Sequence, residues 1–396
     1  MAGDGHTHRS WAEIDRSALL WNLRLLRGRA GDRRLIAVVK ADAYGHGAGP
    51  VSRALEAAGV DALAVATLDE ARELRRAGVG CEILVLQPRS EPGEADALLA
   101  LDALPLISRL ETLDVFEASA QRVGRPARVH LKLDTGMSRL GLPLDRLDAL
   151  LARLGRMPHV AVEGIASHLA DADVVQAPSL RVQRERFAAA LARLGDAALH
   201  PPWRHLDSSA AVLHGPTPGT TAVRVGLALY GADPTRERAF RLAPVMTLCA
   251  RVLDARTLEP GARVGYGGTF VARRPTTLLT LGIGYADGLP RAAGGCFSVG
   301  LGGRRVPLVG RVSMDLATVD AGPRAPTSEG QEVLVFGRKG GQTIAVEELA
   351  DAVGTLAYEI LVGVGRRVPR LARDRDAWAS AGSAAGHSPG SRRSGH

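Results

Sequence analysis

The chain has 396 residues, of which 46% are hydrophobic and 23% charged, and its formal net charge is +8. This length allows two domains with separate cores, and no uninterrupted apolar run approaches the roughly 20 residues that span a bilayer, which excludes a membrane protein. The arginines are scattered without interleaved aromatic residues, so we do not expect nucleic-acid binding despite the positive charge.

The two ends of the chain differ in composition from the rest. Residues 1–10 are polar, rich in His and Gly, and lack the apolar stretch of a signal peptide, which predicts a flexible N-terminus and a cytoplasmic protein. Residues 376–396 are rich in Ser, Gly and Ala and predict a disordered tail. The three cysteines are widely spaced and form no CxxC pattern, so we expect neither a disulfide framework nor a metal site.

Lysine is scarce in this sequence. Lys and Arg together total 50, yet lysine occurs only at Lys40, Lys132 and Lys339, so general positive charge is carried by arginine. A position that keeps lysine is a candidate for chemistry that guanidinium cannot perform, because a buried amine can lose its proton and act as a nucleophile. Lys339 lies in a Gly-rich segment and is interpreted as a solvated charge in a turn, which leaves Lys40 and Lys132 as candidates.

Apolar segments of strand length recur through the first part of the chain, separated by stretches of helical periodicity. Eight strands are predicted, at residues 35–40, 62–67, 82–87, 104–108, 129–133, 160–168, 204–208 and 223–230. Eight strand–helix alternations favour a closed parallel sheet over an open one. We therefore predict an α/β fold that starts with a TIM-type (β/α)8 barrel over residues 11–243.

A different pattern follows the predicted barrel. Short alternating strands with Gly and Pro turns continue to about residue 335, and a last helix is predicted at 346–362. We predict a mostly β C-terminal domain over residues 244–375. Catalytic groups of a TIM-type barrel lie at the C-terminal ends of its strands, and the polar residues at these ends include Lys40, His168 and Arg224.

Residues 39–47, with the sequence Val-Lys-Ala-Asp-Ala-Tyr-Gly-His-Gly, closely resemble the cofactor attachment signature of bacterial alanine racemases, and the similarity extends from about residue 11 to residue 370. The resemblance implies a pyridoxal 5'-phosphate (PLP) enzyme of fold type III in which Lys40 binds the cofactor as a Schiff base and acts as one of two acid/base residues. It also implies that Tyr44 donates to the cofactor phosphate. The mouth of a barrel suits such a lysine, because partial desolvation favours the neutral amine.

The other motifs of the predicted barrel also resemble this family. Arg139 corresponds to an arginine that contacts the substrate carboxylate and the cofactor's phenolic oxygen, and His168 to a histidine that lies against the pyridine ring. Arg224 corresponds to an arginine facing the pyridine nitrogen, where a donor that keeps its proton leaves the ring a weaker electron sink. Further phosphate contacts are implied for Ser209, Gly226 and Leu227.

The predicted β domain carries matching motifs as well. The resemblance makes Tyr266 the second acid/base residue and places Tyr358 on the phosphate side of the cofactor. The substrate is implied to meet three further residues, Tyr285, Met314 and Asp315, with Met314 contributing its backbone amide. Together these motifs imply a homodimer in which each β domain covers the partner's barrel mouth, so that active sites are shared.

Some positions depart from the family pattern. Ser208 stands where the family usually has asparagine, and Asp207 adds a carboxylate near the cofactor. Gly265 and Ser313 replace a usual serine and a common cysteine. These departures bear on the choice of substrate more than on the type of reaction.

Lys132 lies on the strand predicted at 129–133, where alternate side chains point into the barrel. Desolvation and the like charge of Arg139 should lower its pKa, and a neutral amine can add carbon dioxide to become a carbamate that accepts two hydrogen bonds from guanidinium. Some alanine racemases resembling this chain carry that modification. We predict that Lys132 is carbamylated and holds Arg139, the alternative being an unmodified lysine bonded to Asp134.

The favoured interpretation is a racemase that interconverts L- and D-alanine with Lys40 and Tyr266 as its two bases, supplying D-alanine for cell-wall peptidoglycan. A racemase of serine or of a broader set of small amino acids, with a specialised pathway as one option, is the first alternative. A non-catalytic PLP-carrier barrel is a second, although such proteins lack the β domain. A PLP decarboxylase of the same architecture is disfavoured because Arg224 replaces the carboxylate expected opposite the pyridine nitrogen.

Overall fold

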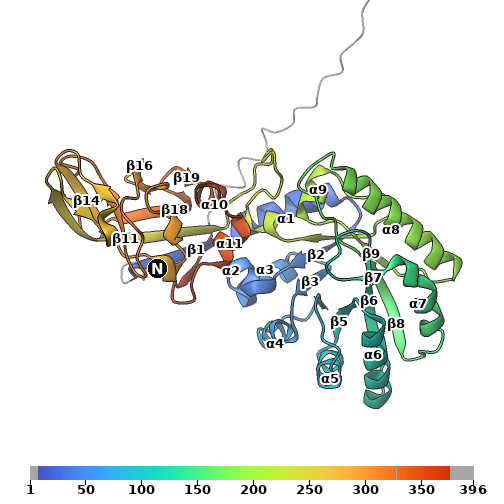
Figure 1. Ribbon diagram of the computed structural model, residues 1–396. Coiled ribbons are helices and arrows are strands. Elements are labelled where there is room, and N and C mark those ends of the chain that lie inside the picture. Colours follow the sequence, from blue (N-terminus) through green and yellow to red (C-terminus); the bar gives the residue numbers. More distant parts are fainter. Residues whose placement is uncertain (1–7, 327, 375–396) are drawn as a thin grey trace, which may run out of the picture.

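The computed structural model describes residues 8–326 and 328–374. Two bodies lie side by side in it, a barrel wrapped by helices and a β-rich domain (Figure 1). The predicted disordered tail at 376–396 and most of the predicted flexible N-terminus at 1–10 lie outside the described residues. Among the described residues, no helix is long and apolar enough to cross a membrane.

The predicted parallel barrel is confirmed. Its strands follow the order β5-β4-β3-β2-β10-β9-β8-β6, and pairing of β5 with β6 closes the ring. The eight strands are β2 (Arg34–Val38), β3 (Ala62–Val65), β4 (Glu82–Val85), β5 (Ala103–Ile107), β6 (Ala127–Asp134), β8 (Val160–Ala166), β9 (Trp203–His205) and β10 (Ala222–Val225). The short β7 (Leu142–Pro143) extends the sheet beside β6.

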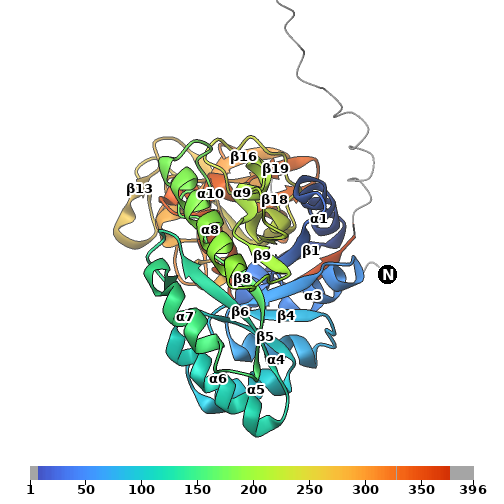
Figure 2. The same ribbon diagram turned by 90° about the vertical axis from the view of Figure 1, so that its right-hand side faces the viewer.

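Helices on the outside of the barrel cover the strands (Figure 2). They are α1 (Arg16–Ala30), α3 (Ala48–Ala57), α4 (Leu68–Arg76), α5 (Pro92–Ala100), α6 (Leu110–Val123), α7 (Leu147–Leu154), α8 (Pro178–Asp196) and α9 (Ser209–His214), with the 3-10 turn η1 (Leu144–Arg146) before α7. Local sequence explains several boundaries. Thr67 and Glu70 form a capping box at the start of α4, and Pro178 occupies the first turn of α8, where its missing N–H costs nothing.

Two predicted elements are wrong in extent. The strand predicted at 223–230 ends at Val225, because the chain turns at Gly226 and continues as the 3-10 helix η2 (Leu227–Tyr230). The helix predicted at 346–362 is two helices, α10 (Val346–Val353) and α11 (Ala357–Val362). They are separated at Gly354, whose φ of 73° ends α10 in the left-handed conformation.

The second domain is built on the long strand β11 (Met246–Leu258), which pairs with β1, β14 and β18. Its strands are β1 (Ser10–Asp15), β12 (Arg263–Val264), β13 (Phe270–Val271), β14 (Thr276–Leu281), β15 (Ser298–Leu301), β16 (Arg304–Pro307), β17 (Ala317–Asp320), β18 (Glu332–Lys339), β19 (Gln342–Ile344) and β20 (Arg370–Arg373). The N-terminal strand β1 thus belongs to this sheet and precedes the barrel only in sequence. The division of the chain near residue 243 stays a prediction.

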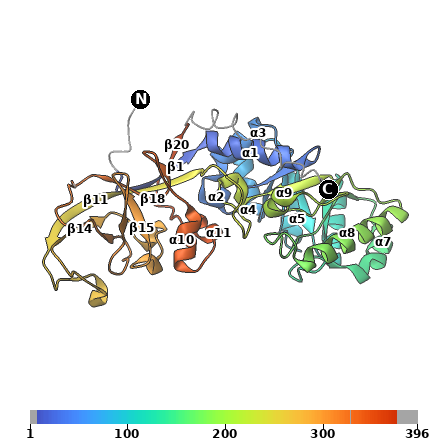
Figure 3. The ribbon, with the colours of Figure 1, turned by 90° about the horizontal axis from the view of Figure 1, so that it is seen from above.

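The 3-10 helices η3 (Tyr266–Gly268), η4 (Tyr285–Asp287) and η5 (Arg291–Ala293) lie in loops of the β domain. Figure 3 shows α10 and α11 between the β sheet and the barrel. A side chain at Gly45 would place its Cβ 2.3 Å from the carbonyl oxygen of Leu361 in α11, so glycine permits this close contact between the domains.

The interpretation of Lys339 as a solvated charge in a turn is wrong. Lys339 ends β18, and its Nζ lies 2.7 Å from carboxylate oxygens of both Glu13 and Glu332. The pair with Glu13 joins β18 to β1, which both border β11, and the pair with Glu332 lies within β18. The lysine therefore has a structural role in the β domain.

Candidate active site

A cavity of about 490 Å³ opens at the carboxyl ends of the barrel strands. It brings together the predicted site residues of the barrel and one from the β domain: Lys40, Tyr44, Lys132, Arg139, His168, Ser209, Arg224, Gly226, Leu227 and Tyr358. Parallel strands all point their carboxyl ends to one face of a barrel, which explains why residues so far apart in sequence converge here.

The segment that follows β2 has an unusual backbone. Lys40 begins α2 (Lys40–Gly45), in which residues 41–44 have φ between 52° and 54°, a left-handed turn made without glycine. This conformation costs a non-glycine residue about 1–2 kcal/mol. Strained backbone of this kind persists only where surrounding contacts enforce it.

Side chains hold this left-handed turn in place. The Nδ1–H of His46 donates to the carbonyl oxygens of Ala43 at 3.0 Å and Tyr44 at 2.8 Å. The Glu70 carboxylate accepts the backbone N–H of Ala41 at 2.7 Å. Burial lowers the pKa of His46 to about 4, so the imidazole stays neutral with its proton on Nδ1.

The amine of Lys40 lies where its neutral form is favoured. Burial and the nearby Arg139 guanidinium lower the pKa of Lys40, and Glu70 opposes them more weakly. A lowered pKa leaves more neutral amine at neutral pH, which is the form that attacks a carbonyl carbon.

Tyrosines and a glycine form the other end of the cavity. The Tyr44 ring stacks on Tyr230 with 4.8 Å between centroids and lies 6.0 Å from the Tyr358 ring. Burial raises the pKa of Tyr44, so its hydroxyl remains a donor. A Cβ at Gly226 would lie 2.5 Å from the Tyr44 Oη, and the Gly226 N–H donates to Ser209 Oγ at 2.7 Å. The hydroxyls of Tyr44 and Ser209 thus lie close to the backbone of Gly226, which has no side chain.

Arg224 is 7% exposed and lines the same cavity. Its guanidinium donates to the carbonyl oxygens of Ser167 at 2.6 Å and His205 at 2.8 Å, and to the Nδ1 atoms of His205 at 2.6 Å and His168 at 3.1 Å. Burial lowers the pKa of Arg224 to about 10, and Asp207 acts in the opposite direction. No carboxylate among the described residues forms an ion pair with Arg224.

Sequence reasoning did not single out two histidines behind Arg224. Since His205 Nδ1 accepts from Arg224, its Nε2–H must donate to His130 Nδ1, 2.9 Å away. Burial lowers the pKa of both His130 and His205, so the pair is neutral. A signal was available for His130: it lies two residues before Lys132 on β6, and strand alternation puts both on the inner face.

Lys132 and Arg139 form the third part of the cavity. Burial lowers the pKa of Lys132 to about 8, with contributions from Arg224 and Arg139 in the same direction. Asp134 is not bonded to Lys132; its Oδ1 accepts the amides of residues 136–138 at 2.9, 3.0 and 3.1 Å and shapes the turn before Arg139. Within residues 8–326 and 328–374, Arg139 makes no hydrogen bond or ion pair.

The remaining predicted site residues do not join this cavity. Tyr266, Tyr285 and Met314 are 71%, 43% and 53% exposed on the β domain, and neither they nor Asp315 line it. Asp207, expected to add a carboxylate near the cofactor, does not line the cavity: it is fully buried and accepts from the Thr217 hydroxyl at 2.5 Å. Ser208 does line the cavity.

Comparisons with known proteins agree with this geometry. Residues 14–234 match the family described as "Alanine racemase, N-terminal domain", and residues 245–372 match "Alanine racemase, C-terminal domain". The chain belongs to the alanine racemase family. An alanine racemase of Symbiobacterium thermophilum is 42% identical over 91% of this chain and 96% of its own length.

Solved alanine racemase structures share the fold. That of the D-cycloserine-producing Streptomyces lavendulae has a TM-score of 0.88 at 37% identity and covers 93% of this chain and 97% of its own. That of Bartonella henselae, with covalently bound pyridoxal phosphate, has a TM-score of 0.84 at 31% identity over 92% of this chain and all of its own.

The residues around the cavity fit PLP. The guanidiniums of Arg139 and Arg224 make it positively charged, Lys40 and Lys132 add amine donors, and among the described residues Asp173 is the single acidic one that lines it. Such a site favours a dianionic ligand. The crowded Gly226 backbone, next to the hydroxyls of Tyr44 and Ser209, supplies the close approach and the donors that a phosphate needs.

Proposed function

We propose that the protein is a PLP-dependent racemase that interconverts L- and D-alanine in the cytoplasm and supplies D-alanine for peptidoglycan. One observation carries the proposal: a single cavity joins a desolvated lysine, Lys40, to Arg224, an arginine that has no carboxylate partner in the described part of the chain. An arginine in this place argues against a decarboxylase, whose electron sink needs a protonated pyridine.

Each group around the cavity has a role in holding the cofactor. Lys40 would attach it through its amine, while Tyr44, Ser209 and the amides of Gly226 and Leu227 would bind its phosphate. Arg224 would donate to the pyridine nitrogen, with His168 against the ring. Bound PLP supplies an electron-withdrawing ring that makes the Cα–H of an attached amino acid acidic.

Racemisation requires a base on each face of the substrate Cα. Lys40 Nζ removes or returns the Cα proton on one face, and Tyr266 Oη does so on the other, so the proton lost to one base is replaced from the other. Arg139 and the Met314 amide bind the substrate carboxylate and keep Cα between the two bases.

The position of Tyr266 supports a homodimer with shared sites. Tyr266 lies on the β domain and is 71% exposed, whereas Lys40 lines the barrel cavity of the same chain. Large apolar side chains are exposed on both sides, with Met314 at 53% on the β domain and Leu356 at 67% on the cavity rim. A second copy of the chain would cover both surfaces and bring Tyr266 to the partner's Lys40.

The proposed substrate is tested by incubating the purified holoenzyme with L-alanine and with L-serine separately and measuring the D-isomers. We expect kcat/KM to be higher for alanine. A higher value for serine would favour the alternative racemase, for which the departures at Ser208, Gly265 and Ser313 provide a reason. No turnover of either amino acid would contradict racemase activity.

A second prediction concerns the modification of Lys132. We propose that Lys132 is carbamylated, because its lowered pKa of about 8 frees the amine and Arg139 has no partner among the described residues. Below this pKa the amine is increasingly protonated and cannot add carbon dioxide. In protein equilibrated with 13C-bicarbonate, we expect a carbamate carbon signal by NMR above the pKa, and its loss as the pH falls well below it.

Two lysine-to-arginine variants control this measurement. Lys132→Arg should abolish the carbamate signal, because guanidinium stays protonated. Lys339→Arg should retain it, since burial of Lys339 is outweighed by Cys249 and by the ion pairs with Glu13 and Glu332, which together raise the pKa of that lysine and keep it charged. A signal that survives Lys132→Arg, or no signal at any pH, would be evidence for the unmodified lysine.

A further inference from the structure

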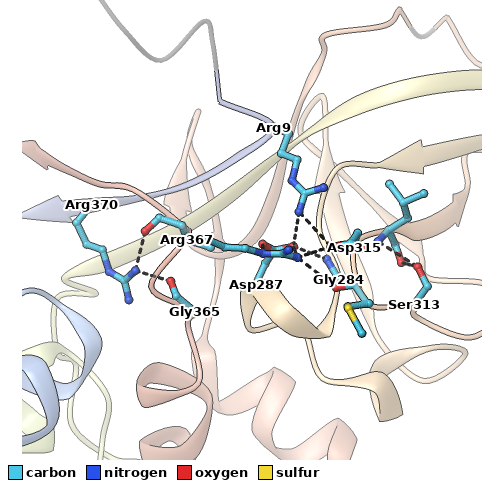
Figure 4. Close-up of polar contacts among 11 residues, drawn as sticks. Arg9, Gly284, Asp287, Ser313, Asp315, Gly365, Arg367 and Arg370 are labelled. Carbon is cyan, nitrogen blue, oxygen red and sulfur yellow. Dashed lines mark hydrogen bonds and ion pairs between the residues drawn. The ribbon is translucent and has the colours of Figure 1, made fainter.

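Arg9, Asp287, Asp315 and Arg367 form a cluster of charged residues at two loops of the β domain (Figure 4). Tyr285 lies in the loop of Asp287, and Met314 in the loop of Asp315. Arg367 contacts both carboxylates of the cluster: its Nε is 2.7 Å from Asp287 Oδ1, and its Nη2 is 3.1 Å from Asp287 Oδ2 and 2.7 Å from Asp315 Oδ1. Arg9 approaches the same two carboxylates, each at 3.5 Å.

The two loops are joined to each other by backbone contacts. The N–H of Tyr285 donates to the carbonyl oxygen of Ser313, and that of Ala286 to the carbonyl oxygen of Met314, both at 3.0 Å. A Cβ at Gly284 would lie 2.3 Å from the Met314 oxygen, so the loops touch with no space between them. We call residues 284–288 and 311–316 the substrate-facing edge.

Arg367 connects the two halves of this edge. Asp287 is 1% exposed and accepts the Gly284 N–H at 2.9 Å, so it belongs to the first loop and needs a cation beside it. Asp315 is 46% exposed and belongs to the second loop, and Arg367 also reaches the Met314 carbonyl oxygen at 3.4 Å. A planar guanidinium can bond two carboxylates in fixed directions, which an ammonium cannot.

The segment that carries Arg367 is itself anchored. Arg370 donates to the carbonyl oxygens of Val364 at 2.7 Å and of Gly365 and Val368 at 2.6 Å each. The same guanidinium donates to the Gly45 carbonyl oxygen at 3.1 Å, at the end of the left-handed turn that begins at Lys40. The hydrogen bonds of Arg370 therefore fix residues 364–368, the segment that carries Arg367.

We propose that Arg367 is a positioning residue that holds the substrate-facing edge in the orientation required by the partner subunit's active site. The inference rests on the proposed function, because Tyr285 and Met314 meet substrate only if the sites are shared. Arg367 acts without touching substrate or cofactor. Its effect passes through Asp287 and Asp315.

The first test compares Arg367→Met with Arg366→Met in the full-length protein. Arg366 is exposed and makes no hydrogen bond or ion pair among the described residues, so it is a matched control. In the cofactor-free dimer, we expect Arg367→Met to speed hydrogen exchange of the amides of Tyr285 and Ala286 by about tenfold or more. Unchanged exchange in a folded variant would overturn the proposal, and this readout does not depend on activity.

Kinetics of the holoenzyme provide the second readout. Misplacing the edge should weaken substrate binding, so we expect Arg367→Met to lower kcat/KM for alanine by about ten- to a hundredfold, mainly through KM. Arg367→Lys should recover part of this loss. If Arg367→Met does not fold, Asp315→Asn removes the contact with the second loop but leaves the buried Asp287 pair, and it should raise KM in the same direction. A normal KM in the folded variants would overturn the inference.

A mixed dimer separates positioning in trans from a defect within one chain. In a heterodimer of Arg367→Met with Lys40→Ala, the only working lysine belongs to the Arg367→Met chain, but its site is covered by the intact edge of the other chain. We expect the KM of this site to return to the wild-type value. A KM that stays raised would show that Arg367 acts on its own barrel and would overturn the proposal, whereas an inactive wild-type protein would contradict the proposed function instead.

Discussion

Lys40→Ala should abolish racemisation and the visible absorbance of lysine-bound PLP, lowering kcat by more than about 10⁴-fold. Lys40 lies at the start of the left-handed turn, and its pKa is lowered by burial and by Arg139. The truncated side chain cannot form an imine with the cofactor. Absorbance spectra after dialysis and D-alanine formation measure the two effects.

Two comparisons make this result specific. Lys40→Arg keeps the positive charge but should be equally inactive, because guanidinium is a poor nucleophile. Lys339→Arg should keep both the absorbance and the activity, since Lys339 lies in the β domain paired with Glu13. Persistence of the absorbance in dialysed Lys40→Ala would move the attachment site to another lysine.

Tyr266→Phe should lower kcat by about 10²- to 10⁴-fold, the range typical of the loss of a general acid/base group. The change removes one hydroxyl from a side chain that is 71% exposed, so we expect neither the fold nor PLP binding to change. Thermal unfolding, PLP absorbance and kcat for each alanine enantiomer measure these expectations.

Tyr285→Phe is the matched control for Tyr266→Phe, because Tyr285 is also exposed on the β domain but has no assigned proton transfer. We expect it to change KM more than kcat. Equal losses of kcat in the two variants, or normal turnover by Tyr266→Phe in both directions, would remove Tyr266 from the second-base role.

Much of the barrel could be predicted because buried parallel strands appear as apolar runs bounded by polar residues. Lys40, His168 and Arg224 could be placed in one site for the same reason, since the strand ends of a barrel converge. The alternation of side chains along a strand could also have placed His130 in the site, because it lies two residues before Lys132 on β6.

What could not be predicted depends on contacts between distant residues. The last barrel strand ends early because the Gly226 amide bonds Ser209 Oγ, 17 residues away in sequence. The ion pair of Lys339 with Glu13 could not be predicted, because Glu13 lies 326 positions away in sequence. Residues 41–44 contain no glycine, so nothing local indicates the left-handed turn that Glu70 and His46 stabilise.

The central claim, that each active site combines Lys40 of one chain with Tyr266 of another, is tested most directly by mixing inactive variants. Lys40→Ala and Tyr266→Phe proteins are unfolded together in equal amounts, refolded with PLP and assayed for D-alanine formation. Half of the dimers should then be mixed, each with one intact site, and activity should reach about a quarter of that of wild-type protein treated in the same way. Activity no greater than the sum of the separate variants, while wild-type protein recovers, would contradict the shared site.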